Sequence, residues 1–152
     1  MVVKALTAAQ RQSLADLVAG RRIEAVPVDS SRAAAFLASA AERISQLPLL
    51  TSPAVSFDVA YDAAHDVGEA ILAAYGFRTT NGPGQHEAVG RLLKAVIDSP
   101  PHHAAASEFD RLRRLRNQGH YGAAPRSAAD AAKAKQIAEA LYSAGVACGV
   151  GT

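Results

Sequence analysis

The residues best suited to chemistry in this 152-residue chain lie in one strongly basic segment. From Glu108 to Gly122 it reads EFDRLRRLRNQGHYG, with arginine at four of the six positions from 111 to 116 and a histidine at 120. Planar guanidinium groups suit phosphate oxygens, and imidazole titrates near neutral pH. These residue types therefore fit the binding of a phosphodiester and proton transfer at it.

Helical spacing brings part of this segment onto one line. Arg116 and His120 are four residues apart and so lie side by side, and Arg113 is two turns before His120 on the same line. This line borders an apolar stripe, whereas Arg111 and Arg114 project elsewhere and could follow a nucleic-acid backbone. The alternative is a solvated basic face, in which the arginines pair only with nearby carboxylates such as Glu108 or Asp110.

A second polar stripe precedes it, on the helix expected over residues 53–75. Its members are acidic residues and one histidine: Asp58, Asp62, His65, Asp66 and Glu69. Asp62 and His65 have the i, i+3 spacing of di-iron bundle ligands, but such sites need a second copy on other helices, and the chain has none. We therefore predict no metal site, and expect a solvated face or a partner that orients Arg113 and Arg116.

The elements that must position these residues are helices. Alanine accounts for 35 of the 152 residues, which favours helix, and no strand alternation persists. Cap and stop signals, with apolar residues at three-and-four spacing, predict helices from Thr7 to Gly20, Asp29 to Leu47, Ser52 to Tyr75, about 86 to 98, Ala104 to Tyr121, and from Ser127 onward, with a frayed Gly-containing tail. The prediction is an all-α, up-and-down bundle of about five or six helices in a single domain over residues 1–152, with 1–28 as an N-terminal helix and linker.

Composition excludes several classes of protein. One cysteine, Cys148, rules out an intrachain disulfide framework, and no apolar stretch approaches the roughly 20 residues of a membrane span. The first residues also lack the pattern of a signal peptide. We expect a soluble, cytoplasmic protein with no membrane partner and no cofactor.

The basic segment resembles the HEPN family of small helical-bundle proteins. That family is marked by an arginine followed by four to six residues and then a histidine; five residues separate Arg114 from His120, and six separate Arg113 from it. Arg116-Asn117 resembles the family's arginine–polar pair, although it stands one residue too close to His120, and Tyr121 directly follows the histidine. The resemblance covers about residues 30–145 and includes the predicted helix that ends at Gly76-Phe77-Arg78.

The resemblance implies metal-independent RNA cleavage. His120 would act as general acid or base, Arg113 or Arg116 would hold the scissile phosphate, and Asn117 would orient phosphate or histidine. The RNA backbone would lie along Arg111, Arg114 and Tyr121.

The resemblance also implies partners: a second copy in a homodimer, and an antitoxin or nucleotidyltransferase protein if the chain is the toxin of such a pair. The departures from the motif leave a degenerate, non-cleaving branch open. The competing function is a non-catalytic interaction module that binds a protein, a nucleotide or uncleaved RNA.

Overall fold

The computed structural model describes residues 2–121 and 125–151, without the side chains of residues 119–121. Within these ranges the elements follow in the order α1 (Ala8–Ala19), β1 (Ile23–Ala25), α2 (Ser30–Gln46), the 3-10 helix η1 (Leu47–Leu49), α3 (Pro53–Tyr75), β2 (Phe77–Thr79), α4 (Gln85–Val96), α5 (His103–Tyr121) and α6 (Ala128–Ala147). The predicted all-α helical bundle is confirmed. None of the described helices combines the length and the apolar character needed to cross a membrane.

The helices begin and end where local chemistry predicts. Thr7 and Gln10 form the expected capping box before α1, and Ser52 caps α3 with Pro53 at its first position. Asp29 and Ser127 accept hydrogen bonds from backbone N–H groups at the starts of α2 and α6. Such caps satisfy N–H groups that have no partner inside the helix, so the starts follow from a few adjacent residues.

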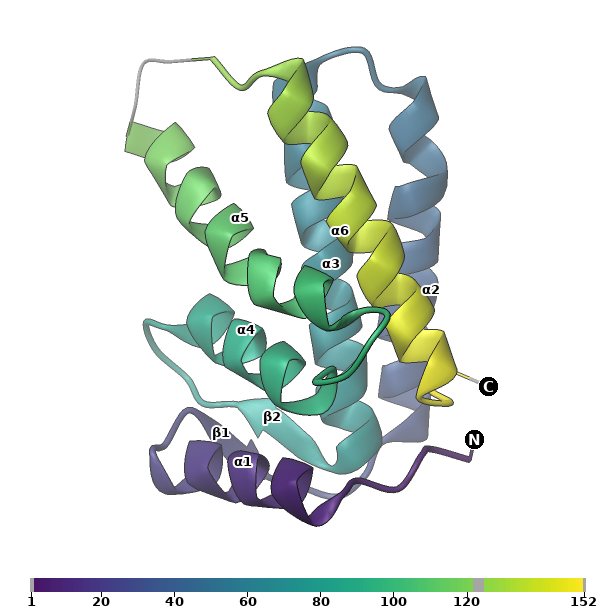
Figure 1. The fold of residues 1–152 in the computed structure, drawn as a ribbon, viewed down its shortest axis with the longest axis vertical. Coiled ribbons are helices and arrows are strands. Elements are labelled where there is room, and N and C mark those ends of the chain that lie inside the picture. Colours follow the sequence, from purple (N-terminus) through teal and green to yellow (C-terminus); the bar gives the residue numbers. More distant parts are fainter. Residues whose placement is uncertain (1, 122–124, 152) are drawn as a thin grey trace.

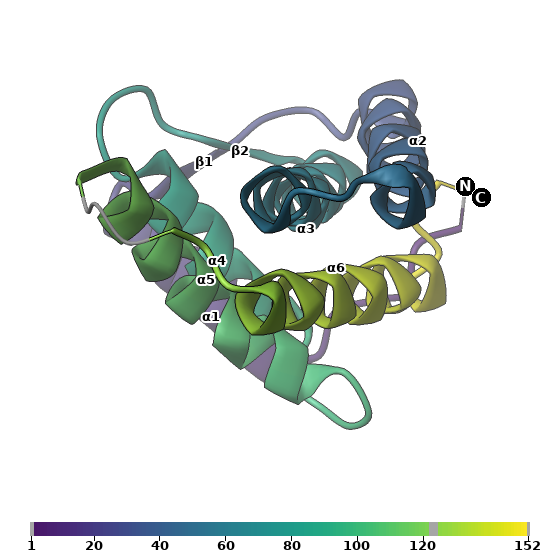
Figure 2. The same cartoon turned by 90° about the horizontal axis from the view of Figure 1, so that it is seen from above.

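Helix α3 is the centre of the bundle. It packs against α2, α6, α4 and α5, and Figure 2 shows these helices around it, with the side toward β1 and β2 free of helices. Thirteen of its residues are buried, and Gly68 lets α4 approach so closely that a Cβ atom there would lie 2.3 Å from Val89 Cγ1. Helices α4 and α5 run in opposite directions beside α3, and α1 lies below α4 (Figure 1). The start of α4 thereby comes close to the second half of α5.

A short β-ladder is the main departure from the prediction. β1 and β2 pair antiparallel, with Ile23 opposite Thr79 and Ala25 opposite Phe77. We expected connections over residues 21–28 and 76–85, because three-residue strands are too short to show alternation. The ladder joins the segment that follows α1 to the segment that follows α3. At the end of α3, Gly76 adopts a left-handed φ of 82°.

The chain after α6 is packed rather than frayed, so the expectation of a loose tail is wrong. Val150 is fully buried, and a Cβ atom on Gly151 would lie 2.7 Å from Leu37 Cδ2. Lys4 N donates a hydrogen bond to the Cys148 carbonyl oxygen at 2.8 Å, so the two ends of the chain lie side by side (Figure 1). Small residues allowed this approach, and composition alone did not reveal it.

Candidate functional site

The candidate site is built on the second half of α5. Phe109 and Leu112 are buried and fix the helix against α3 and α4, as the apolar spacing predicted. Gly90 of α4 faces Phe109, where an added Cβ would meet the ring at 3.3 Å. This contact sets which α5 side chains turn inward and which face the solvent.

Arg113 lies at the edge of the buried face. Its Nε donates a hydrogen bond to Asp110 Oδ1 at 2.8 Å, and only 21% of its side chain is exposed. Asp110 also pairs with the more exposed Arg114, at 3.4 Å from Nε. Arg113 and Asp110 line a cavity of about 520 Å³ together with Glu87, Arg91 and Lys94 of α4. Three cations and two carboxylates therefore meet in one hollow between α1, α4 and α5.

Arg116 lies one turn further and points toward α3. Its Cζ atom lies 4.9 Å from the centre of the Tyr61 ring, a cation–π contact. Its Nε is buried and has no hydrogen-bond partner, and no carboxylate of the described residues lies within 4 Å of its nitrogens. Arg116 is thus a half-buried cation that stacks on an aromatic ring and has no carboxylate within ion-pair distance among the described residues, although its charge acts on the pKa of Asp62.

The Tyr61 ring belongs to a cluster that sequence analysis did not predict. We call Tyr61, His65, His86 and Arg116 the imidazole cluster. The Tyr61 hydroxyl and His86 Nδ1 share a hydrogen bond of 2.8 Å, and the rings of His65 and His86 have centres 4.3 Å apart. His65 Nε2 is buried without a partner, while His86 is half-exposed in the first turn of α4. Two buried nitrogens without partners in one cluster mark it as a site rather than ordinary core.

Burial and positive charge keep both imidazoles neutral. Burial lowers the pKa of His65 to about 4, with further lowering by His86 and Arg116. The pKa of His86 is lowered by burial and then by Arg116; Asp62 raises it in part, and Arg113 lowers it by the smallest amount of the four. Burial raises the pKa of Tyr61, so its hydroxyl keeps its proton. The cluster therefore offers neutral imidazole next to fixed positive charge.

The acidic stripe on α3 interacts with α2 as well as with the basic helix: burial raises the pKa of Asp62, and the charge of Arg116, followed by that of Arg43, opposes this rise. Arg43 of α2 donates to Asp66 Oδ2 at 2.9 Å and lies 3.8 Å from Asp62. Ser39 donates a second hydrogen bond to Asp66, also at 2.9 Å. The stripe thus joins α2 to α3, and Asp110 of α5 itself, rather than the stripe, holds Arg113. Among the described residues no three metal-ligating side chains stand together in a way that could hold an ion.

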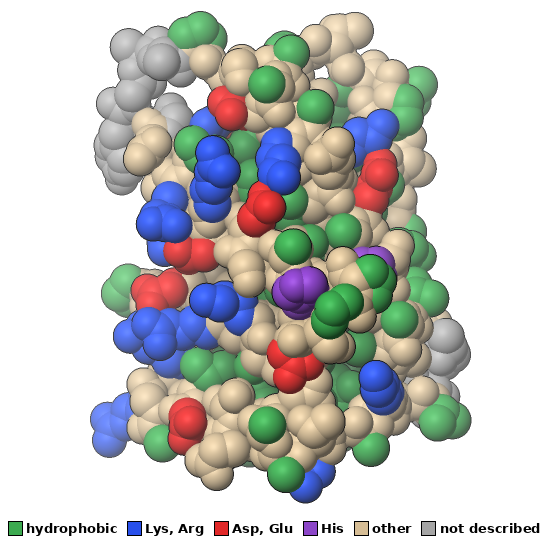
Figure 3. Space-filling model, viewed as in Figure 1, with side chains coloured by type: hydrophobic (Ala, Val, Ile, Leu, Met, Phe, Trp, Pro, Cys, Tyr) green, Lys and Arg blue, Asp and Glu red, His purple; other side chains and the backbone are tan. Residues whose placement is uncertain are grey.

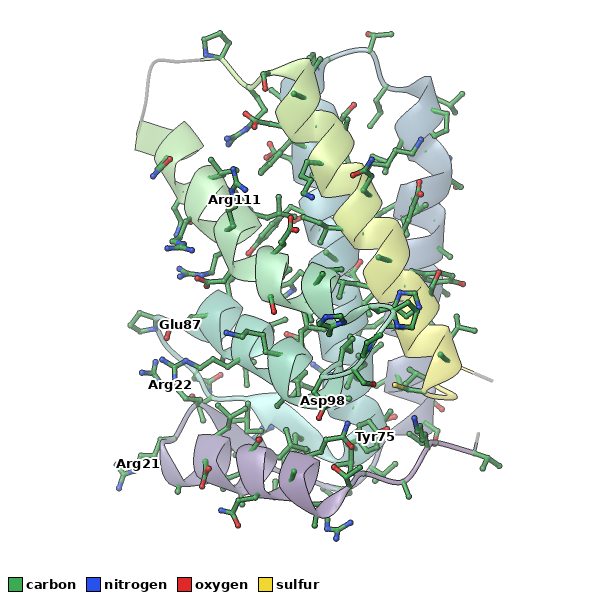
Figure 4. The ribbon with its side chains drawn as sticks, viewed as in Figure 1. Arg21, Arg22, Tyr75, Glu87, Asp98 and Arg111 are labelled. Carbon is green, nitrogen blue, oxygen red and sulfur yellow. The ribbon has the colours of Figure 1, made fainter. Side chains whose placement is uncertain are left out.

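The predicted site residues divide into three groups. Arg113 and Arg116 lie on one line and border the buried stripe, as expected. Arg111, Arg114 and Asn117 are exposed, and Figure 4 shows Arg111 on the side of α5 that is turned toward α6. The side chains of His120 and Tyr121 lie outside the described part, which carries only their helical backbone.

Tyr61, His65 and His86 are the functional candidates that sequence reasoning missed. His65 belongs to the predicted polar stripe and His86 begins the helix predicted over about 86 to 98, and neither pattern indicates that the two rings meet. The one signal was that a buried tyrosine hydroxyl needs a partner, but that partner lies 25 residues away and its identity depends on the tertiary fold.

Basic side chains gather on one side of the surface around this site. Figure 3 shows lysine and arginine side chains over α4 and α5, with acidic side chains between them. Arg22, before β1, lies 3.8 Å from Glu87 of α4, and Figure 4 shows the two on the same edge of the molecule. The positive charge on this surface is therefore confined to the region of α4 and α5, and the acidic side chains between the basic ones neutralise part of it.

A comparison of the chain with family models, with curated proteins and with solved structures finds no match.

Proposed function

We propose that the protein binds single-stranded RNA along the second half of α5 and cleaves it without a metal ion, as a HEPN-like endoribonuclease. The observation that carries this proposal is the state of Arg116, a half-buried guanidinium that stacks on Tyr61 and whose Nε has no partner. A buried charged donor without an acceptor is costly, and a phosphate oxygen is a strong acceptor for it. Binding of a phosphodiester would satisfy this group.

The roles in the proposed reaction follow the basic segment. Arg113 and Arg116 hold the scissile phosphate and stabilise the negative charge of its transition state. His120, one turn after Arg116 on the α5 backbone, transfers protons at the ribose 2′-hydroxyl or the leaving oxygen, and Asn117 orients the reacting groups. The exposed Arg111 and Arg114, with Tyr121, contact the flanking nucleotides.

The proposal extends to partners. A second copy of the chain would bring two such segments to one cleft and double the positive potential that attracts RNA. An antitoxin or a nucleotidyltransferase protein would cover the basic surface if the nuclease acts as a toxin.

A non-catalytic interaction module is the second candidate, and one observation favours it. Asp110 pairs with both Arg113 and Arg114 on its own helix, so two of the four arginines of the segment are already compensated. A face of this kind can bind RNA or an acidic protein without any chemistry.

Incubation of single-stranded RNA, and of DNA of the same sequence, with the protein in excess EDTA tests the proposal. We expect RNA to be cut and DNA to remain intact, because DNA lacks the attacking 2′-hydroxyl. His120→Ala should reduce the rate about 10²- to 10⁴-fold, the usual contribution of one acid–base group. His103→Ala, at the exposed start of α5, is the matched control and should keep the rate.

Two results would contradict the proposal. Wild-type protein that leaves RNA intact excludes the nuclease, and if it still retards RNA in a gel the module is correct. His120→Ala that cuts as fast as wild type excludes the assigned mechanism.

A further inference from the structure

His86 lies within the electrostatic reach of the arginines that the proposed function assigns to the phosphate. Among the charged groups of the described residues, Arg116 affects its pKa most, followed by Asp62 in the opposite direction and then by Arg113, and Tyr61 is its hydrogen-bond partner. His86 is in the first turn of α4. Because α4 and α5 run in opposite directions, this turn lies beside the second half of α5 (Figure 1). The His86 imidazole and the Arg116 guanidinium thus both contact Tyr61, so that side chains of α3, α4 and α5 meet there.

We propose that His86 is a second catalytic imidazole at this site, which accepts the proton of the ribose 2′-hydroxyl, and that Tyr61 is the positioning residue that orients it. This inference rests on the proposed function, since it requires RNA to bind at Arg113 and Arg116. It adds a residue from outside the basic segment to the reaction.

The geometry of the His86 ring supports this role. Its Nδ1 is engaged by the Tyr61 hydroxyl at 2.8 Å, so Nε2 is the nitrogen left for a substrate. In the working tautomer Nδ1–H donates to the tyrosine oxygen, and Nε2 presents its lone pair. The rings of Tyr61 and His86 are nearly parallel, with an interplanar angle of 7°, and Phe109 stacks on Tyr61 with ring centres 5.3 Å apart. The tyrosine is therefore fixed by packing and can hold the imidazole.

Exposure separates the two imidazoles of the cluster. Both histidines are half-exposed as whole residues, but His65 Nε2 is buried and cannot reach a substrate. His65 lies behind His86, with ring centres 4.3 Å apart, and limits its movement into the core. His86 is the member that can meet the 2′-hydroxyl.

The step balances without any further reactant. The 2′-oxygen forms a bond to phosphorus, and the bond from phosphorus to the 5′-oxygen breaks, which gives a 2′,3′-cyclic phosphate and a 5′-hydroxyl. The 2′-hydroxyl proton moves to His86 Nε2. The departing 5′-oxygen takes a proton from His120, and water then exchanges the proton between the two imidazoles.

Bound phosphate should change the titration of His86. The charged and titratable groups that act on it or contact it are Tyr61, Asp62 and His65 of α3, and Arg113 and Arg116 of α5. A phosphate between the two arginines offsets their positive charge. We expect the pKa of His86, followed by NMR of its ring protons, to rise when 3′-uridine monophosphate is added to the wild-type protein. An unchanged pKa overturns the inference, and this readout needs no variant to fold.

Kinetics of RNA cleavage in EDTA complete the test. His86→Asn should lower kcat about 100-fold or more with little change in KM, while His103→Asn, an exposed histidine elsewhere on α5, should keep both. Tyr61→Phe keeps the ring under Arg116 but loses the hydroxyl, so kcat should fall less and the acidic limb of the pH profile should move. Tyr75→Phe, which loses a hydroxyl bonded to the Lys4 carbonyl oxygen, is its matched control.

The outcomes separate the two proposals. If wild type cleaves and His86→Asn cleaves with the same kcat and pH profile, His86 has no catalytic role and the proposed function stands. If wild type does not cleave RNA, the proposed function fails and this inference fails with it.

Discussion

Two neighbouring side chains in the imidazole cluster differ in their charge state. His65 is partly buried and neutral, with its Nε2 shielded from water, whereas Arg116 near it is always charged. Water screens exposed charges, but these groups are partly removed from it, so each strongly affects the other. The stability of the fold should therefore depend on the protonation of His65.

Lowering the pH should destabilise the protein through His65. Its pKa is about 4 in the fold and about 6.5 when exposed, so the folded state resists protonation and the unfolded state accepts it. The stabilisation is complete above about pH 6.5 and is lost as the pH falls toward 4. From pH 7 to pH 5 the loss is about 2 kcal/mol of unfolding free energy, since one pKa unit corresponds to ~1.4 kcal/mol.

Urea denaturation at both pH values measures this loss. His65→Gln should remove most of the difference, and the exposed His103→Gln should retain it. Equal pH dependence in wild type and His65→Gln would show that His65 is not the responsible group.

At the residue scale, the sequence predicted the parts of the site that lie within one helix. The line of Arg113 and Arg116 follows from helical periodicity, and so does the exposure of Arg111. The Tyr61–His86 hydrogen bond depends on how α3 packs against α4, which spacing along the chain does not encode. Asp110 was recognised as a neighbour, but only the fold shows that it binds two arginines at once.

Helices were the best predicted elements, because their signals are local. Thr7, Ser52 and Ser127 each act within three residues of a helix start. The β1–β2 ladder joins residues more than 50 positions apart, and each strand is only three residues long. No local pattern of that length distinguishes a strand from a turn.

The contact between α3 and α4 depends on the absence of a side chain at position 68. Gly68→Ala should destabilise the protein by ~1–3 kcal/mol, because the new methyl would stand 2.3 Å from Val89 Cγ1 and force the helices apart. The higher helix propensity of alanine offsets less than ~1 kcal/mol of this.

Thermal or urea unfolding of four proteins tests the contact: wild type, each single variant and the double variant Gly68→Ala/Val89→Ala. The second change removes the obstructing methyl groups, so the double variant should lose less stability than the two single losses added together. If the losses of unfolding free energy of the two single variants add up in the double variant, the side chains at positions 68 and 89 do not clash.

Over the whole molecule, the net charge is too small to produce the proposed RNA binding by itself. The formal charge is +2, and acidic side chains stand between the basic ones on the face that Figure 3 shows. Any strong attraction for a polyanion must come from local geometry on α5.

Two double variants with the same change in net charge separate local from global effects. Arg111→Gln/Arg114→Gln and Arg11→Gln/Arg21→Gln both take the formal charge from +2 to 0. We expect only the first to weaken RNA binding, with the salt slope of log K falling by about 0.7 for each lost phosphate contact.

Fluorescence anisotropy with a labelled single strand at several salt concentrations measures both quantities. Arg21 is a suitable control because Figure 4 shows it at the far edge of the molecule, beyond α1. If both double variants weaken RNA binding equally, the RNA does not bind specifically along α5.

The hydrogen bond from Lys4 N to the Cys148 carbonyl oxygen makes the backbone nearly a closed loop. A short peptide linker could join those ends covalently without moving either one. The polypeptide could then be opened instead at exposed residues 81–84, between β2 and α4, so that a circular permutant keeps every helix. In that rearranged chain α4, with His86 near its first residue, would be the segment that leaves the ribosome first.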